Sequence, residues 1–336
     1  MGTAGILGLD IGGANLKAAT ADGRAASVPF ALWKQPDRLP AALAELVAQF
    51  PDAAELAVTM TGELCDCFET KRQGVNAILD ATEHAAAGRP VRVWGTDGAF
   101  HTISESRANH LTVAAANWHA LATFAGRFAP YHGGILIDIG STTSDLIPLD
   151  SGLPSTYGLT DWTRLQVREL VYAGVRRTPV FAVYPDRVCA ELFATTADVY
   201  VVLGLLPENE HDTDTANGRP LTVEHALTRL AHVLGADREE LGDDHLIHFA
   251  TRVHDRLRGQ LADAARGVYY DQQQAPELRT AIVSGTGEFL ARQVIDRVFG
   301  GAPIERTVSL NDELGPTVSA CAPAYAVAVL AAEGRA

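Results

Sequence analysis

The most constraining feature of this chain is a ten-residue pattern that occurs twice. Gly8–Lys17 reads GLDIGGANLK, and Leu136–Asp145 reads LIDIGSTTSD. In each copy an apolar run ends in Asp-Ile-Gly, a tight turn follows, and a second strand begins, at Leu16–Ala19 or Asp145–Leu149. The repeat predicts two β-hairpins of the same build. We therefore expect two similar domains in tandem, with a boundary near the Pro130–Gly134 turn.

Both turns carry groups that suit a phosphate and a divalent cation. Glycines leave backbone N–H groups open to phosphate oxygens, and hydroxyls beside them add further donors. Carboxylates at a strand end can hold Mg²⁺ directly or through water. A plain turn capped by its Asp is the alternative for the first copy alone, but repetition of both frame and chemistry favours the ligand site. The predicted phosphate-binding residues are Gly12, Gly13, Asn15, Gly140, Ser141, Thr142 and Thr143, and the predicted Mg²⁺ ligands are Asp10, Asp138 and Asp145.

The remaining segments alternate between strand and helix patterns. Such alternation implies a mixed α/β sheet covered by helices. Strands are expected at Leu56–Met60, Val91–Trp94, Val180–Val183 and Ala281–Ser284. Helices are expected at Leu39–Phe50, Gly74–Ala87, Leu111–Phe128, Trp162–Ala173, Leu246–Val268, Phe289–Val298 and Pro323–Ala332, with a polar loop at Glu208–Pro220.

A glycine-rich turn between a strand and a helix forms a third signal. It consists of Ser284, Gly285, Thr286 and Gly287. A turn of this kind brings a ligand close to a helix N-terminus. Taken alone the signal is weak, because short glycine-rich turns are common.

In this order, the three segments resemble the phosphate-1, phosphate-2 and adenosine motifs of the actin/sugar-kinase/Hsp70 superfamily. The resemblance implies an α/β protein of two RNase H-like domains with a cleft between them. The first domain would span residues 1–130, including a first connecting helix at Leu111–Phe128. The second would span 131–336, with a helical insertion at about 160–270 and a C-terminal connecting helix.

A narrower resemblance points to the hydantoinase/oxoprolinase-A-like group linked to tetrahydromethanopterin-dependent one-carbon transfer. The strings that carry it are Thr59–Asp66, Glu69–Val75, Ala116–Trp118, Gly174–Pro179 and Phe193–Asp198. Archaeal members of this group take part in methanofuran biosynthesis. The resemblance implies a transferase that joins an aminomethylfuran-methanol diphosphate to a tyramine- or tyrosine-type phenol, releasing diphosphate with Mg²⁺ and without consuming ATP.

The sequence departs from the kinase pattern at two places that affect whether ATP would bind. Gly13 stands where kinases of the fold commonly have a hydroxyl, and Ser284 and Thr286 put side chains into the adenosine-like turn. Both departures weaken the case for ATP as a ligand. Whether ATP binds stays open, and we do not expect it to be consumed. The alternatives are an ATP-dependent small-molecule kinase or an amide hydrolase of the same fold, and a nucleotide-switched interaction protein.

The residues expected to act on the substrate follow the Leu56–Met60 strand. Glu63 and Asp66 are candidate general bases, with N-capping and solvent exposure as the alternative. Lys71, a candidate catalytic cation, and Arg72 open the next helix and could contact the diphosphate. Arg176, followed by Arg177, suits a phosphate or carboxylate.

The composition and charge of the chain limit which classes of binding partner we expect. The net charge is −14 and no Lys/Arg-rich run occurs, which argues against nucleic acid or an anionic membrane as partner and leaves a small phosphorylated substrate. No apolar stretch reaches the roughly 20 residues of a membrane span, and Met1–Leu9 lacks the features of a signal peptide. Four cysteines predict a reduced, cytoplasmic protein, and a homodimer remains open.

Overall fold

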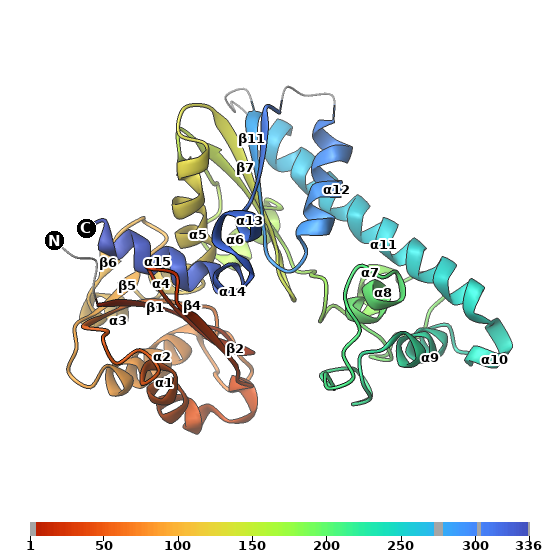
Figure 1. The fold of residues 1–336 in the computed structure, drawn as a ribbon, viewed down its shortest axis with the longest axis horizontal. Helices are drawn as coiled ribbons and strands as arrows, with labels where there is room; N and C mark the ends of the chain where they lie inside the picture. The colour runs from red at the N-terminus through yellow and green to blue at the C-terminus, as the bar shows by residue number, and fades with distance from the viewer. Residues whose placement is uncertain (1–4, 272–277, 301–303, 335–336) are drawn as a thin grey trace.

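The computed structural model of this protein describes residues 5–271, 278–300 and 304–334. Two sheets, each with its own helices, form the molecule (Figure 1). The first sheet has the strand order β3-β2-β1-β4-β5-β6. Its strands are β1 (Ile6–Ile11), β2 (Asn15–Thr20), β3 (Ala25–Pro29), β4 (Glu55–Met60), β5 (Val91–Trp94) and β6 (Phe100–His101).

The second sheet repeats the arrangement of the first. Its order is β10-β8-β7-β11-β12, with β9 beside β8. In both sheets the first strand of the predicted hairpin pairs antiparallel with the second and parallel with a later strand. This is the topology expected for two RNase H-like domains in tandem; the limits at 130 and 131 stay a prediction. The strands are β7 (Gly133–Ile139), β8 (Ser144–Asp150), β9 (Leu153–Pro154), β10 (Leu170–Val171), β11 (Leu278–Ser284) and β12 (Arg306–Ser309).

Two helices, α5 (Asn117–Ala125) and α15 (Ala322–Ala332), lie where the sheets meet. One buried cluster joins them to Ala57 of the first sheet and Ile282 of the second. The packing is close, because a Cβ on Gly8 would lie 1.9 Å from the Ala324 carbonyl oxygen. The two expected connecting helices therefore share one core with both sheets.

Three predicted elements were wrong in detail. Leu111–Phe128 is not one helix: it breaks after α4 (His110–Val113), where Ala115 has a left-handed φ of 48°. The segment Trp162–Ala173 ends its helix α6 (Asp161–Gln166) early and then forms β10, which pairs with β8. Val180–Val183 is the helical turn α7, since an apolar run of four residues does not distinguish a strand from a buried helical turn.

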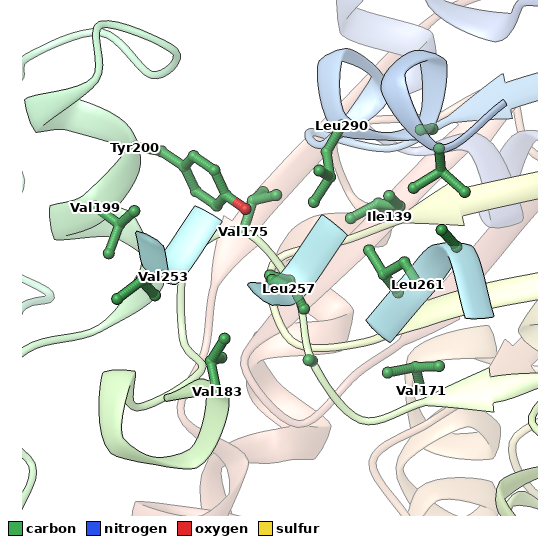
Figure 2. Close-up of a cluster of buried hydrophobic side chains, with 14 of the residues drawn as sticks. Ile139, Val171, Val175, Val183, Val199, Tyr200, Val253, Leu257, Leu261 and Leu290 are labelled. Carbon is green, nitrogen blue, oxygen red and sulfur yellow. The ribbon is translucent and has the colours of Figure 1, made fainter. Parts of the chain in front are cut away.

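The other helices cover the sheets and build the region between β9 and β11. In Figure 1, α8 to α11 extend from the second sheet on the side away from the first. Figure 2 shows the core that ties them to the second hairpin: Ile139 at the end of β7 packs near Leu261 and Leu290. The helices are α1 (Leu39–Val47), α2 (Lys71–Ala86), α3 (Ile103–Ala108), α8 (Thr196–Val202), α9 (Val223–Val233), α10 (Arg238–Leu241), α11 (Asp243–Arg266), α12 (Glu288–Phe299), α13 (Leu310–Leu314) and α14 (Pro316–Ser319), with short 3₁₀ turns at Leu32–Lys34, Pro36–Arg38 and Gly126–Phe128 and a π turn at Gly267–Asp271.

Within the described ranges, no helix combines the length and apolar character that a membrane crossing requires. The expected polar loop lies between α8 and α9, and contains one isolated bridge, between Asn209 and Leu221.

Candidate active site

The first hairpin places a buried carboxylate at the end of β1. Asp10 is buried, and among the described residues its Oδ1 has no hydrogen-bond partner. Burial raises the pKa of Asp10, and the charge of Lys17 opposes that rise. The turn is closed by the Gly12 N–H, which donates to the Asn15 carbonyl oxygen over 3.1 Å. An unsatisfied buried carboxylate of this kind is costly without a cation or a proton.

The second hairpin places Asp138 at the corresponding position. Burial, and next the neighbouring carboxylate of Asp145, raise the pKa of Asp138 to about 7. Lys17, on the first hairpin, lowers it. Lys17 therefore lies within electrostatic range of both Asp10 and Asp138.

Asp145, the third predicted metal ligand, forms an ion pair within its own domain. Its Oδ1 accepts a hydrogen bond from Arg164 Nη1 over 2.8 Å, and both side chains are buried. Arg164 also donates to the Glu169 carbonyl oxygen and lies with its Cζ 3.9 Å from the Trp118 ring centroid. Asp145 thus anchors α6 to β8, and its role as a metal ligand stays a prediction.

Asp10 and Asp138 fit a magnesium ion that is shared with a phosphorylated ligand. No cluster of three or more potential metal-binding side chains occurs in the described part of the chain. Mg²⁺ at phosphate sites, however, needs only one or two carboxylates, with phosphate oxygens and water completing the shell. The partnerless Oδ1 of Asp10 is the observation that supports this fit.

Residues 174–177 pack against the turn of the second hairpin and donate hydrogen bonds to it. The carbonyl oxygen of Gly140 accepts from the Val175 N–H, and that of Ser141 accepts from the N–H groups of Arg176 and Arg177. Gly174 is needed for this contact, because a Cβ there would lie 2.5 Å from the Gly140 oxygen. The side chains of Ser141, Thr142 and Thr143 remain partly exposed.

The glycine-rich turn after β11 packs against the same hairpin. Gly285 has a φ of 85°, and a Cβ there would meet the Ile139 carbonyl oxygen at 2.3 Å and Asp138 Oδ1 at 2.6 Å. The Gly287 N–H donates to the same Ile139 oxygen over 2.8 Å. Ser284 is buried opposite Asp138, whereas Thr286 is exposed. The two glycines are therefore explained by contact with the hairpin.

Glu63 is the most unusual carboxylate of the first domain. It is 1% exposed, and neither of its oxygens has a hydrogen-bond partner among the described residues. Burial raises the pKa of Glu63 to about 7; Lys71 lowers it and Asp161, from the second domain, raises it. Its backbone is fixed by α2, because a Cβ on Gly74 would lie 2.1 Å from the Glu63 carbonyl oxygen.

Glu63 also lies close to the first phosphate hairpin through its own loop. A Cβ on Gly13 would be 2.7 Å from the Sγ of Cys65, two residues after Glu63. Gly13 therefore has a packing reason to be glycine rather than the hydroxyl residue of the kinases. Asp66, the other candidate base, is exposed.

Two predicted phosphate-binding cations point elsewhere. Arg72 is exposed and its Nη1 donates to the Arg107 carbonyl oxygen over 3.4 Å. Arg176 forms an ion pair with Asp212 in the polar loop. Each guanidinium group therefore already has a partner within the protein, and phosphate binding by Arg72 or Arg176 stays a prediction. Lys71, at the start of α2, does lie near Glu63.

Lys17 acts on both Asp10 and Asp138, and sequence reasoning did not single it out. Lys17 on β2 is the register partner of Asp10 on β1. In the second hairpin, Asp145 on β8 is the register partner of Asp138 on β7. Aligning the two repeats would have shown it, since Lys17 and Asp145 are the tenth residues of their copies. The first hairpin thus presents a cation where the second presents a carboxylate.

Comparison with known proteins matches this chain over nearly its whole length. It is 35% identical to the (4-{4-[2-(gamma-L-glutamylamino)ethyl]phenoxymethyl}furan-2-yl)methanamine synthase of Methanocaldococcus jannaschii, covering 97% of each chain. It is 28% identical over 204 residues to the Methanococcus vannielii protein of the same name, covering 58% of this chain and 89% of that one.

Among solved structures, nucleotide-free acetone carboxylase superposes with a TM-score of 0.54. The sequence identity is 13%, and the match covers 97% of this chain and 70% of the other. This likeness supports the fold and carries nothing about activity. The Hydantoinase/oxoprolinase family profile matches residues 55–333. The chain belongs to the hydantoinase/oxoprolinase family.

Proposed function

We propose that this protein is a transferase of methanofuran-type cofactor biosynthesis. It joins an aminomethylfuran-methanol diphosphate to a tyramine- or tyrosine-type phenol and releases diphosphate. The observation that carries the proposal is the pair of repeated hairpins with buried Asp10 and half-buried Asp138, with the buried Glu63 in the loop beside the first. The relative's printed name supports it, because that product contains a phenoxymethylfuran ether.

The reaction needs a leaving group held in place and a phenol brought to the furan methylene carbon. Asp10 and Asp138 would hold Mg²⁺, which when bound neutralises charge on the departing diphosphate. The N–H group of Gly13 donates to a phosphate oxygen, and Lys17 adds a positive charge. From the second hairpin, the hydroxyls of Ser141, Thr142 and Thr143 do the same.

Glu63 takes the proton of the phenol as its oxygen attacks. The carbon–oxygen bond to diphosphate breaks, the ether bond forms, and the phenol proton passes to Glu63 and then to water. A carboxyl group with a pKa of about 7 suits this role, because the ideal pKa of a general base lies near the working pH. Lys71 supports the ionised form of Glu63.

ATP is not needed in this scheme. The free energy of the reaction comes from the diphosphate ester of the donor. We further propose that the protein acts on small molecules in the cytoplasm, consistent with four free cysteines among the described residues.

The direct test measures diphosphate release from the furan diphosphate and a phenol, with and without Mg²⁺ and ATP. We expect Mg²⁺-dependent release, an ether product of matching amount, and no effect of ATP. Turnover of ATP to ADP with no ether product would instead establish the kinase or amide hydrolase reading.

A further inference from the structure

Two buried hydroxyl groups lie beside the hairpins and are not used by the mechanism above. They belong to Thr59, near the end of β4, and to Ser284, at the end of β11. Both residues are at most 1% exposed. Among the described residues, neither hydroxyl oxygen has a hydrogen-bond partner. A buried hydroxyl group without a partner costs free energy, so each of the two requires an explanation.

The register of the strands places each hydroxyl group next to a hairpin carboxylate. Strand β4 runs parallel to β1, and Thr59 is the register partner of Asp10. Strand β11 runs parallel to β7, and Ser284 is the register partner of Asp138. Neighbouring strands lie about 4.8 Å apart, and register partners direct their side chains to the same face of the sheet. Each hydroxyl group therefore projects beside one of the two predicted metal ligands.

The backbone around the two pairs is repeated as well. The carbonyl oxygen of Ile11 accepts the N–H groups of Thr61 and Gly62 over 2.9 and 3.0 Å. The carbonyl oxygen of Ile139 accepts the N–H group of Gly287 over 2.8 Å. In each domain, the residue after the hairpin aspartate is thus bonded to the segment that follows the hydroxyl-bearing strand. The two hydroxyl groups occupy equivalent places in the two domains.

Both carboxylates can accept a further hydrogen bond from this side. The Oδ1 of Asp10 has no partner in the described part of the chain. A Cβ on Gly285, the residue after Ser284, would lie 2.6 Å from Asp138 Oδ1, so this carboxylate is close to β11. The Ser284 hydroxyl group lowers the pKa of Asp138, as a nearby donor does, although its geometry falls short of a hydrogen bond.

We infer that Thr59 and Ser284 are positioning residues of the metal site. Each donates its hydroxyl hydrogen to the carboxylate in register with it and so orients that carboxylate for the Mg²⁺ shared with diphosphate. This inference rests on the proposed function and adds two residues to its diphosphate site. It also gives Ser284 a use other than contact with an adenosine.

The test measures binding of diphosphate to the full chain by calorimetry, with and without Mg²⁺. Thr59→Val and Ser284→Ala each remove one hydroxyl group. Each should raise the Kd for diphosphate in the presence of Mg²⁺ about tenfold or more, because hydrogen bonds to charged groups are among the stronger ones in proteins. Thr59→Ser keeps the hydroxyl group and should bind like the wild type. Binding of diphosphate without Mg²⁺ should be the same in every variant.

Thr82→Val is the matched control. Thr82 lies on α2, is as buried as Thr59, and donates its hydroxyl hydrogen to the Ile78 carbonyl oxygen over 2.8 Å. Its replacement removes a hydroxyl group away from the hairpins and should leave the Kd unchanged. Thermal unfolding without ligand separates a structural role from a positioning role. Thr59→Val and Ser284→Ala should not lower the unfolding midpoint, because neither removes a hydrogen bond within the protein.

Each hydroxyl group is judged by its own variant. Weaker Mg²⁺-dependent binding in Thr59→Val and Ser284→Ala, with wild-type binding in Thr59→Ser, supports the inference. Wild-type affinity in the first two variants, or an equal loss in Thr59→Val and Thr59→Ser, overturns it. A Thr59→Val protein that does not fold shows a structural role for Thr59, and Ser284→Ala, in the other domain, then decides. A wild type that binds no diphosphate with Mg²⁺ overturns the inference, whereas formation of the ether product tests the proposed function separately.

Discussion

The environment of Glu63 follows from the backbone around it rather than from any ion pair. The loop after β4 turns inward at Gly62, and Gly74 of α2 packs directly on the Glu63 carbonyl group. The carboxylate is therefore buried with no side-chain hydrogen-bond donor among the described residues, and the backbone groups of Glu63 and Ala115 lower its pKa; Asp66, three residues later, is exposed. Burial without a partner is the arrangement that tunes a carboxyl group for proton transfer.

Replacing Glu63 should therefore affect rate and pH dependence together. We expect Glu63→Gln to lower kcat by about 10²–10⁴, the typical contribution of a general base. In the wild type, kcat/KM should rise as pH increases through about 7, because the base acts in its ionised form. Asp66→Asn is the matched control and should retain both. A Glu63→Gln enzyme with full kcat and an unchanged pH profile would favour a carbocation-like path in which the phenol attacks before losing its proton.

The same carboxyl group should make stability depend on pH. Glu63 has an ordinary pKa of 4.5 when unfolded and about 7 when folded, so the folded state binds the proton more tightly. The contribution of Glu63 to the free energy of unfolding is therefore fully present below pH 4.5 and is lost as pH rises through about 7, by roughly 3 kcal/mol in full. Lys71 and Asp161 are the charged side chains that act on it, with opposite signs.

Denaturant unfolding at pH 5 and pH 8 measures this effect. Glu63→Gln should be more stable than the wild type at pH 8 and close to it at pH 5, although it is catalytically impaired. Asp66→Asn should match the wild type at both values. Equal stability of Glu63→Gln and wild type at pH 8 would mean that the folded protein already satisfies the ionised carboxylate.

Asp138 should matter for the ligand and not for the fold. Its charge is opposed by burial and by Asp145, so the carboxylate does not stabilise the second domain. We expect Asp138→Ala to abolish diphosphate release while the midpoint of thermal unfolding stays equal or rises. Near-normal turnover of this variant would show that the site has been placed wrongly.

At the scale of elements, each hairpin is built into its surroundings by glycine contacts and buried charges. Gly285 and Gly287 bring the turn after β11 against Ile139, and Gly174 brings the segment before α7 against Gly140. On the other side, the Arg164–Asp145 pair joins α6 to β8. The hairpin that carries the hydroxyls proposed to bind phosphate is thus held from two sides.

Breaking that pair should destabilise the second domain. Arg164→Met leaves Asp145 buried without its partner, which costs about 3–5 kcal/mol. The double variant Arg164→Met/Asp145→Leu removes both charges and should recover much of the loss. Thermal and denaturant unfolding of the single and double variants measure the difference. An Arg164→Met protein as stable as the wild type would show that the pair has no structural role.

The repeated hairpins could be predicted from sequence because their pattern lies within ten consecutive residues. The roles of Asp145 and Arg176 could not, since each depends on a partner far along the chain: Arg164 for Asp145, and Asp212 for Arg176. The helix break at Ala115 was also invisible, because an apolar, alanine-rich run favours a continuous helix until tertiary contacts impose a left-handed residue.

At the scale of the whole molecule, the two hairpins belong to different sheets that share an interdomain core. Lys17 of the first domain lowers the pKa of Asp138 in the second domain. The Cζ of Arg177, in the second domain, lies 5.1 Å from the ring centroid of Trp33, in the first domain. A ligand that binds both hairpins therefore joins the domains and favours the state in which they are together.

This coupling predicts a specific pattern of ligand-induced stabilisation. Diphosphate with Mg²⁺ should raise the midpoint of thermal unfolding, since a ligand at about 100 times its Kd adds about 2.7 kcal/mol to the free energy of unfolding. Either Asp10→Ala or Asp138→Ala alone should abolish the shift, because each removes one side of the shared site. Mg²⁺ alone should give a small shift, as two carboxylates without phosphate oxygens do not complete its shell.

ATP provides the decisive comparison. The diphosphate part of ATP could enter the hairpins, but its adenosine would have to lie against the turn that contains exposed Thr286 and buried Ser284. Those side chains, and the close contact of Gly285 with Asp138, leave no bare glycine surface for the base. We therefore expect ATP with Mg²⁺ to shift the unfolding midpoint less than diphosphate at equal concentration. A larger shift with ATP that also disappears in Asp138→Ala would identify the hairpins as a nucleotide site and place the kinase alternative first.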